Sequence, residues 1–202
     1  MIKLGVLASG RGSNFQSIID SIKNGYLAAS IEILITDNPD AFALIRASEN
    51  NIPSICIEMS EDKAQYYAKV VEQLQGKGVE LVILAGFMRI VASPLLEAYK
   101  LKIMNIHPAL LPSFKGLHGQ RQALKYGVKI AGCTVHFVDD GVDTGPIIAQ
   151  AAAPVYSDDT EESLSKRILE LEHIIYPQAI KLFSEDRLVI HGNIVTILNE
   201  LN

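Results

Sequence analysis

The sequence predicts an α/β protein built on a doubly wound, mostly parallel sheet, with an antiparallel edge strand and a C-terminal hairpin. Short apolar runs alternate along the chain with segments whose apolar residues recur at helical spacing. The mainly apolar run at residues 79–84 is typical of a strand that is buried on both faces of a parallel sheet. Loops rich in glycine or proline follow several of these strands directly, which favours a ligand site at one edge of the sheet.

The composition indicates an ordinary globular protein. A chain of 202 residues is long enough for one α/β domain, and its net charge of −5 disfavours nucleic acid as the main partner. Cys56 and Cys133 lie inside apolar runs, which favours buried thiols in a reducing compartment. No apolar run approaches the ~20 residues that cross a bilayer. We therefore expect a soluble, cytoplasmic protein without membrane partners, and the sequence leaves its oligomeric state open.

The first half of the chain alternates predicted strands and helices. Ser93 and Pro94 suit the N-cap and the first position of a short helix that precedes the central strand. The predicted strands are residues 2–8, 31–35, 54–57 and 79–84. The predicted helices contain Phe15, Ile18, Ile19 and Ile22, then residues 41–50, then Tyr67, Val70, Val71 and Leu74.

A glycine loop at residues 10–14 connects the first strand to its helix. This arrangement aims backbone N–H groups at an anion, and Ser13 and Asn14 add side-chain donors. The loop lacks the Gly-Lys-Ser/Thr of a Walker A motif, and Phe15 stands where a dinucleotide fingerprint has its third glycine. Asp37 follows the glycine loop at about the sequence spacing that the ribose-binding acid has in a dinucleotide-binding motif. A nicotinamide cofactor therefore stays an alternative to phosphate. Helix capping without a ligand is another.

A second candidate site lies at the end of the strand predicted for residues 101–106. This strand stops at His107-Pro108, because proline has no N–H for a sheet ladder. Asn105 and His107 are two positions apart, so their side chains lie on the same side of the strand. An amide and an imidazole suit an oxyanion that develops on an attacked carbonyl. The alternative is an asparagine that caps a turn and a histidine that only packs.

The second half combines two strands, two helices and a hairpin. In the strand at residues 132–138, the alternation places Thr134 and His136 on the face opposite Cys133, Val135 and Phe137. The other predicted elements are a helix at 118–127, an acidic turn-rich loop at 139–146, an antiparallel edge strand at 147–154 and a hairpin at 187–198. In the last long helix, the predicted buried stripe consists of Leu164, Ile168, Leu171 and Ile175. Glu172 is expected to face away from this stripe.

Four of the notable loops follow strands directly: residues 10–14, 85–91, 105–107 and 139–143. If those strands are all parallel, the four loops open onto one edge of the sheet, where ligands of doubly wound proteins bind. The sequence then predicts that an anion site, an apolar slot with one arginine, an amide–imidazole pair and a carboxylate lie together.

Four motifs, taken in this order, resemble the phosphoribosylglycinamide formyltransferases of the folate-dependent formyltransferase superfamily. They are Gly-x-Gly-Ser-Asn, Leu-Ala-Gly-Phe-Met-Arg-Ile, Asn-Ile-His-Pro-x-Leu-Leu-Pro and Gly-x-x-Val-His-Phe-Val-x-x-x-x-Asp-x-Gly-Pro. The resemblance covers nearly the full chain. It implies a Rossmann-like formyltransferase fold that forms a single domain over residues 1–202. In this domain residues 1–100 would be a phosphate-binding half, and residues 101–202 a catalytic and folate-binding half.

The resemblance also implies roles for individual residues. The catalytic set would be Asn105, His107 and Asp143. The ribonucleotide would be held at its phosphate and ribose by Gly12, Ser13, Asn14 and Glu172. The folate would be held by Lys63, Met88, Arg89, Ile90, Val91, Asn105, Asp139, Asp140, Gly141, Val142 and Asp143. Lys63 departs from relatives that often carry arginine at this position. The lysine ammonium is a single point charge, whereas an arginine guanidinium can donate two parallel hydrogen bonds to a carboxylate.

The implied reaction moves a formyl group from 10-formyltetrahydrofolate to the amine of 5′-phosphoribosylglycinamide in de novo purine biosynthesis. It would proceed by direct attack through a tetrahedral intermediate, without a metal. The same superfamily includes formyltetrahydrofolate hydrolases and methionyl-tRNA formyltransferases, which usually carry an additional domain. From the residues alone, a nicotinamide-dependent oxidoreductase, a nucleotide-binding module and a metal hydrolase stay open, the last of these using His107, His118, His136 and Asp143.

Overall fold

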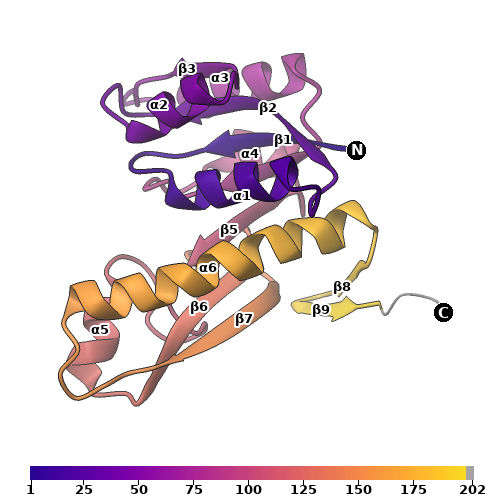
Figure 1. The fold of residues 1–202 in the computed structure, drawn as a ribbon. Coiled ribbons are helices and arrows are strands. Elements are labelled where there is room, and N and C mark those ends of the chain that lie inside the picture. The colour runs from indigo at the N-terminus through magenta and orange to yellow at the C-terminus, as the bar shows by residue number, and fades with distance from the viewer. Residues whose placement is uncertain (199–202) are drawn as a thin grey trace.

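The computed structural model describes residues 1–198, which form a nine-stranded sheet covered by helices on both faces (Figure 1). The strand order is β3-β2-β1-β4-β5-β6-β7-β9-β8. The strands are β1 (Ile2–Leu7), β2 (Ala29–Thr36), β3 (Ser54–Cys56), β4 (Leu81–Leu84), β5 (Ile103–His107), β6 (Ile130–Phe137), β7 (Ile147–Pro154), β8 (Leu188–His191) and β9 (Ile194–Ile197). The helices are α1 (Ser13–Lys23), α2 (Phe42–Glu49), α3 (Lys63–Gly76), α4 (Ser93–Ala98), α5 (Gly119–Tyr126) and α6 (Glu161–Ser184).

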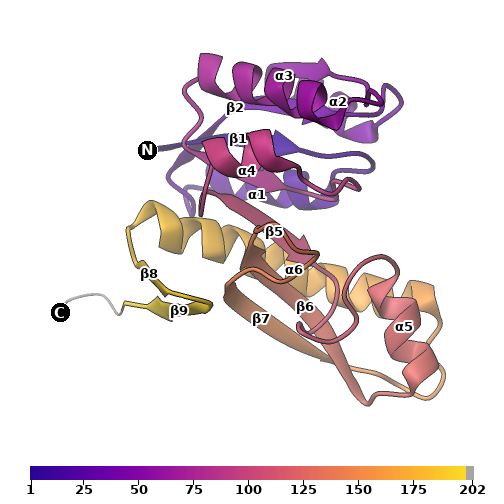
Figure 2. The ribbon, with the colours of Figure 1, turned by 180° about the vertical axis from the view of Figure 1, so that it is seen from behind.

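The first five strands, β1 to β5, are parallel, as the alternation of apolar runs and helical faces predicts. Because successive side chains of a strand point to opposite faces, this part of the sheet feeds two hydrophobic cores. One core contains residues of α1, α2 and α6, and the other contains residues of α3 and α4. Figures 1 and 2 show these two helical layers from opposite sides of the molecule.

The predicted elements are confirmed, with shifts of one or two residues at their ends. The strand expected at residues 79–84 begins at Leu81, since the Val79 N–H donates to the Leu74 carbonyl oxygen in the last turn of α3 at 3.0 Å rather than to a neighbouring strand. The prediction for α4 is wrong by one residue. Ala92 is its N-cap, so Ser93 is already helical and Pro94 follows inside the first turn.

The second half of the sheet is antiparallel. β6 pairs antiparallel with β5, and β7 pairs antiparallel with β6 as predicted. The prediction that β7 is an edge strand is wrong, since β9 joins it in parallel through the single pair Ile147–Ile194 and β8 takes the outer position. The hairpin of β8 and β9 turns at Gly192, whose φ of 60° lies in the left-handed region that glycine adopts readily.

The last helix, α6, starts with a capping box formed by Thr160 and Ser163, and it runs through Pro177. The expectation that Glu172 faces away from its buried stripe is wrong. Glu172 lies four residues after Ile168 and four before Tyr176, and all three side chains are buried. A spacing of four residues keeps side chains on one face of a helix, so the carboxyl group of Glu172 lies inside the molecule.

The Tyr176 hydroxyl fixes α6 to the centre of the sheet. It lies 2.9 Å from the Leu84 carbonyl oxygen at the end of β4 and 2.8 Å from the Met104 carbonyl oxygen in β5. Within residues 1–198, no helix combines the length and the apolar composition that would let it span a membrane.

Candidate active site

The strand β5 presents two different faces. Met104 and Ile106 belong to the hydrophobic core that contains α6, whereas Asn105 and His107 point to the opposite face, as the alternation predicts. The register of the β5–β6 pair places Asn105 opposite His136 and His107 opposite Thr134. Polar side chains of both strands therefore gather on the sheet face opposite α6. Figure 2 shows the backbone of these strands from that side, with α6 behind them.

His107 is buried and lies between two hydrogen-bond acceptors. Its Nδ1 is 3.3 Å from Oδ2 of Asp143, and its Nε2 is 2.8 Å from the carbonyl oxygen of Phe114. A protonated imidazole donates at both positions, whereas a neutral ring donates at only one. The surroundings of His107 therefore match an imidazolium whose orientation is fixed at both ends.

Asp143 reaches His107 by a path that differs from the prediction. The condition that all four strands are parallel does not hold for β6, which is antiparallel to β5 and ends opposite Met104. The loop after β6 therefore starts away from His107 and has to run back along the sheet face. Asp143 adopts a φ of 51° in this loop, and its Oδ2 accepts a hydrogen bond of 2.8 Å from the Gly116 N–H.

Asp143 is held in its ionised form. Burial by itself would raise the pKa of this carboxyl group, but interactions with His136, with the Gly116 N–H and with His107 outweigh burial and lower the pKa below its ordinary value. A carboxylate with a lowered pKa, next to a buried histidine, provides the negative charge that orients and stabilises an imidazolium.

His136 sets the orientation of Asn105. The Nδ1 of His136 lies 2.8 Å from the Phe137 carbonyl oxygen and therefore carries a proton. In the neutral ring, Nε2 accepts a hydrogen bond from Nδ2 of Asn105 at 3.2 Å, whereas a protonated ring donates from Nε2 towards Oδ1 of Asp143, 3.6 Å away. The second N–H of the same amide is left to donate to another group.

The loop that supplies the Phe114 carbonyl is anchored from β6 and β7. The buried Thr134 hydroxyl donates to the Ala109 carbonyl oxygen at 2.7 Å and accepts from the Leu111 N–H at 3.0 Å. Gln150 donates to the Leu111 carbonyl oxygen at 2.9 Å. These contacts fix the chain between His107 and Phe114.

The glycine loop after β1 has the shape that the sequence predicts for an anion site. Gly12 has a φ of 66°, and a Cβ atom added to it would lie 3.0 Å from the Cβ of Ala43. The Ala43 N–H donates to the Gly10 carbonyl oxygen at 3.1 Å, so α2 packs closely against the loop. Ser13 and Asn14 form the first turn of α1, where backbone N–H groups are free of intrahelical partners.

Asn14 and Glu172 form a buried pair, although 158 residues separate them in the sequence. Nδ2 of Asn14 donates to Oε2 of Glu172 at 2.7 Å, and Oδ1 of Asn14 is buried without a hydrogen-bond partner among the described residues. Burial raises the pKa of Glu172 to about 7, although the hydrogen bond from Asn14 acts in the opposite direction. A buried polar atom without a partner is typical of a site that a ligand completes.

The loop after β4 combines exposed apolar side chains with a bound arginine. Met88 and Ile90 are 66% and 64% exposed, whereas Val91 is buried. Nε of Arg89 lies 2.5 Å from Oδ2 of Asp37, and this carboxylate raises the pKa of the guanidinium. Because Asp37 is bound in this way and its side chain is almost fully buried, it does not offer a carboxylate to the ribose of a nicotinamide cofactor.

The other predicted folate residues are spread more widely. Asp139 is engaged inside its own loop, since its Oδ1 accepts from the Gly141 N–H and from the Thr144 hydroxyl. Asp140 and Val142 lie in the same loop. Lys63 is exposed at the first turn of α3, and no hydrogen bond or ion pair within residues 1–198 joins it to the other predicted folate residues.

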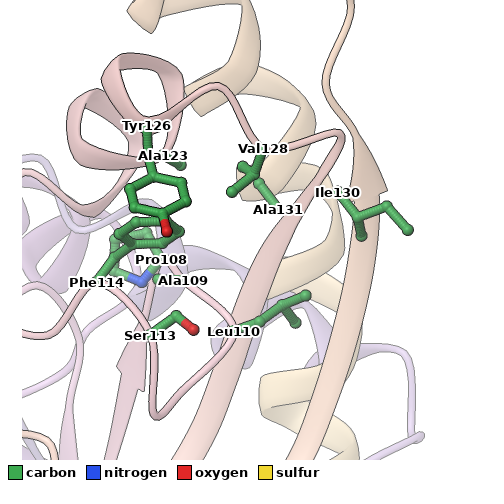
Figure 3. A pocket seen from close by; sticks show the side chains of 10 residues that line it. All are labelled: Pro108, Ala109, Leu110, Ser113, Phe114, Ala123, Tyr126, Val128, Ile130 and Ala131. Atoms are coloured by element: carbon green, nitrogen blue, oxygen red, sulfur yellow. The ribbon is translucent and has the colours of Figure 1, made fainter.

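A cavity of about 410 Å³ lies beside the catalytic candidates but does not contain them. In Figure 3 the rings of Phe114 and Tyr126 lie on one side of it, and Val128 and Ala131 lie on another. Its lining is mainly apolar, and it includes neither Asn105 nor Asp143. The cavity therefore lies next to the loop that carries Phe114 and is separate from the candidate catalytic residues.

No group of three or more histidine, cysteine, aspartate and glutamate side chains in residues 1–198 is arranged to hold a metal ion. Of the set considered for a metal hydrolase, Asp143 lies within 3.6 Å of His107 and of His136, but the set does not form such a group. His118, one of its members, is the N-cap of α5 with a φ of 62°.

Sequence reasoning missed several groups of the site. Phe114 and Gly116 contribute only backbone atoms, which residue types do not reveal. His136 was placed on the correct face by the alternation of its strand, but its contact with Asn105 depends on the strand register. Asp37 was considered only as a ribose-binding acid, although a neighbouring loop with a single arginine was a signal for an ion pair.

Comparison with known proteins places these features in a family. Residues 2–180 match the family described as formyl transferase. The chain is 48% identical over 183 residues to phosphoribosylglycinamide formyltransferase from Bacillus subtilis (strain 168), an alignment that covers 90% of this chain and 94% of that protein. It is 38% identical to the enzyme of the same name from Escherichia coli (strain K12), covering 93% and 90% of the two chains.

A solved structure gives the same result. The crystal structure of glycinamide ribonucleotide transformylase 1 from Symbiobacterium toebii superposes with a TM-score of 0.97 at 50% sequence identity, and the match covers 98% of this chain and 95% of that one. A family match over most of the chain, near-complete coverage of relatives and a shared fold all agree. The chain belongs to the formyl transferase family.

Proposed function

We propose that this protein transfers the formyl group of 10-formyltetrahydrofolate to the amine of 5′-phosphoribosylglycinamide, a step of de novo purine biosynthesis. Support comes from two relatives named phosphoribosylglycinamide formyltransferase, which are 48% and 38% identical and match over 94% and 90% of their own length. We expect the enzyme to act in the cytoplasm on these small molecules, without nucleic acid as a partner.

The nucleotide would bind at the loop after β1. Gly12, Ser13 and Asn14 would hold its phosphate through backbone N–H groups and side-chain donors at the start of α1. Glu172 would bind the ribose hydroxyls, and a hydroxyl group could complete the unpartnered Oδ1 of Asn14. The buried pair and the helix terminus thus fit an anionic sugar phosphate.

The folate would bind between the loops after β4 and β6. The exposed side chains of Met88 and Ile90 suit a flat apolar ring, and backbone groups from Arg89 to Val91 and from Asp139 to Asp143 would read its polar edge. This arrangement would place the formyl carbon near Asn105 and His107.

In the proposed reaction the neutral amine attacks the formyl carbon, and a C–N bond forms as the carbonyl oxygen becomes an oxyanion. Asn105 donates a hydrogen bond to this oxyanion, and the positive charge of protonated His107 stabilises it. Asp143 keeps His107 oriented and charged. A proton then moves from the attacking nitrogen to the departing folate nitrogen, with Asp143 as the acid–base group, and the C–N bond to the folate breaks.

The single observation that carries the proposal is the contact between His107 and Asp143, on the same face of β5 as Asn105. A buried imidazole with a carboxylate at Nδ1, beside an amide donor, is suited to stabilising a developing negative charge. A residue that only packs in the core would not need an ionised partner.

A label-transfer assay tests the proposal. The purified protein is incubated with 10-formyltetrahydrofolate carrying an isotopic label in the formyl group, with and without glycinamide ribonucleotide. We expect the label on the nucleotide amine, with little release of formate. Formate release at the same rate without the nucleotide would instead identify a hydrolase, and no release or transfer would contradict formyl chemistry altogether.

A further inference from the structure

Ser9 links three loops at the carboxyl edge of the parallel sheet. It directly precedes the loop at residues 10–14, and its N–H donates to the Gly86 carbonyl oxygen at 3.1 Å. Its hydroxyl accepts from the Met88 N–H at 3.0 Å, and its carbonyl oxygen accepts from Nδ2 of Asn38 at 3.1 Å. All the polar groups of one small residue are thus used between the ends of β1, β2 and β4.

Asp37 forms a second link between the same loops. It follows β2, next to Asn38, and its carboxylate holds Arg89 of the loop after β4. The side chain of Asp37 is 1% exposed, and its Oδ1 has no hydrogen-bond partner among the described residues. Burial of a carboxylate with one oxygen unsatisfied is unfavourable for folding, so stability does not explain its presence. Neither Ser9 nor Asp37 contacts the described Asn105–His107–Asp143 set.

We propose that Ser9 and Asp37 are positioning residues that couple the nucleotide loop (residues 10–14) to the folate loop (residues 85–91), so that binding of each substrate raises the affinity for the other. The inference rests on the proposed function, because it concerns the two substrates assigned there. The loop at residues 10–14 and the loop at residues 85–91 share one hydrogen-bonded network. A ligand that orders one loop therefore lowers the entropic penalty of ordering the other.

The test measures binding without turnover. Tetrahydrofolate lacks the formyl group, so it forms a non-reactive complex with glycinamide ribonucleotide. Calorimetry gives the dissociation constant of each ligand alone and in the presence of a saturating concentration of the other. The ratio is the coupling factor, and it must be equal in both directions because linkage is reciprocal.

For the unaltered protein we expect a coupling factor of roughly 5 to 150, the usual range for linked sites. In Ser9→Ala and in Asp37→Asn the factor should fall to within about twofold of one, while the constants for each ligand alone change by less than about threefold. The two variants break different links, so one of them still tests the network if the other does not fold.

A matched control removes an arginine pair elsewhere. Arg121 on α5 forms an exposed ion pair with Glu161, and Arg121→Met should keep the full coupling factor. A factor near one in the unaltered protein, or an unchanged factor in both variants, would overturn the coupling and leave the proposed function intact. Failure of the unaltered protein to bind either ligand would overturn both.

Discussion

At the scale of single residues, the site consists of two neighbouring contacts, one between His107 and Asp143 and the other between Asn105 and His136. Asp143 is ionised and lies 3.3 Å from Nδ1 of His107, and the Phe114 carbonyl occupies the other side of the ring. His136 holds one N–H of the Asn105 amide, so the other N–H can point to substrate. The proposed oxyanion site is therefore set before any substrate binds, which is the condition for efficient electrostatic stabilisation.

Replacing Asn105 tests whether its side-chain amide is a hydrogen-bond donor of the proposed oxyanion site. Asn105→Ala should lower the rate of formyl transfer by roughly 10²- to 10³-fold, the usual loss for one oxyanion donor. Binding of tetrahydrofolate and of the nucleotide should change little, because the donor acts on charge that develops only during reaction. Steady-state kinetics with separate binding titrations measure both. A rate near that of the unaltered enzyme would remove Asn105 from the oxyanion site.

Glu172 gives a prediction about stability and pH. Its pKa is about 7 in the folded protein instead of the ordinary 4.5, so the folded state favours the neutral carboxyl group. The contribution of the neutral Glu172 carboxyl group to the stability of the folded state is complete below about pH 4.5 and is lost as the pH rises to 7. Glu172→Gln should therefore match the unaltered protein at pH 4.5 and exceed its free energy of unfolding by about 3 kcal/mol at pH 8.

Urea denaturation at the two pH values measures this difference. Glu170→Gln, at an exposed position on the same helix, is the control and should stay within about 0.5 kcal/mol of the unaltered protein at both pH values. A stability difference for Glu172→Gln that does not depend on pH would contradict the raised pKa.

At the scale of elements, the sequence predicts what local pattern determines. The strands, the helices and the position of the glycine loop follow from hydrophobic period and from turn residues, and the structure confirms them. The direction of β6 and the path of the loop after it depend on long-range pairing, which no local pattern encodes. Glu172 was misplaced for a similar reason, because a charged residue within a helix is expected to face solvent.

The loop that carries Asp143 should tolerate no side chain at Gly145. A Cβ atom at this position would lie 1.9 Å from the Phe137 carbonyl oxygen, so Gly145→Ala must displace the loop. We expect formyl transfer to fall by about 10²-fold, since a misplacement of ~1 Å at a catalytic group has effects of this size. Activity assays and a crystal structure of the variant measure the rate and the shift.

Gly76→Ala is the matched control for Gly145→Ala. It ends α3, and a Cβ atom there meets nothing within 4 Å, so activity should be unchanged. An active Gly145→Ala enzyme whose loop has moved would show that the position of Asp143 is not critical.

At the scale of the whole molecule, one sheet joins the two halves of the site. The proposed phosphate-binding loop at residues 10–14 follows β1, the proposed oxyanion residues lie at the end of β5, and α6 brings Glu172 across to Asn14. Tyr176 holds this helix to the central strands through the carbonyl oxygens of Leu84 and Met104. The geometry of the proposed nucleotide site therefore depends on the docking of α6 onto the sheet.

Removal of the Tyr176 hydroxyl should loosen this docking. Tyr176→Phe leaves two buried carbonyl groups without their donor, and we expect the free energy of unfolding to fall by about 1–3 kcal/mol. Tyr26→Phe, at an exposed position where the ring contacts Lys181, should change it by less than about 0.5 kcal/mol. Equal stability of both variants in urea denaturation would mean that the hydroxyl does not hold the helix.

The central claim is that Asp143 and His107 work together in formyl transfer to the nucleotide amine. The measurement that tests it most directly is the single-turnover rate of transfer from 10-formyltetrahydrofolate to glycinamide ribonucleotide, with both substrates saturating, for the unaltered protein and for Asp143→Asn. We predict that the variant binds both substrates but transfers at least ~10²-fold more slowly, because the charge that supports His107 and accepts the proton is gone. Equal single-turnover rates in the two proteins would contradict the account.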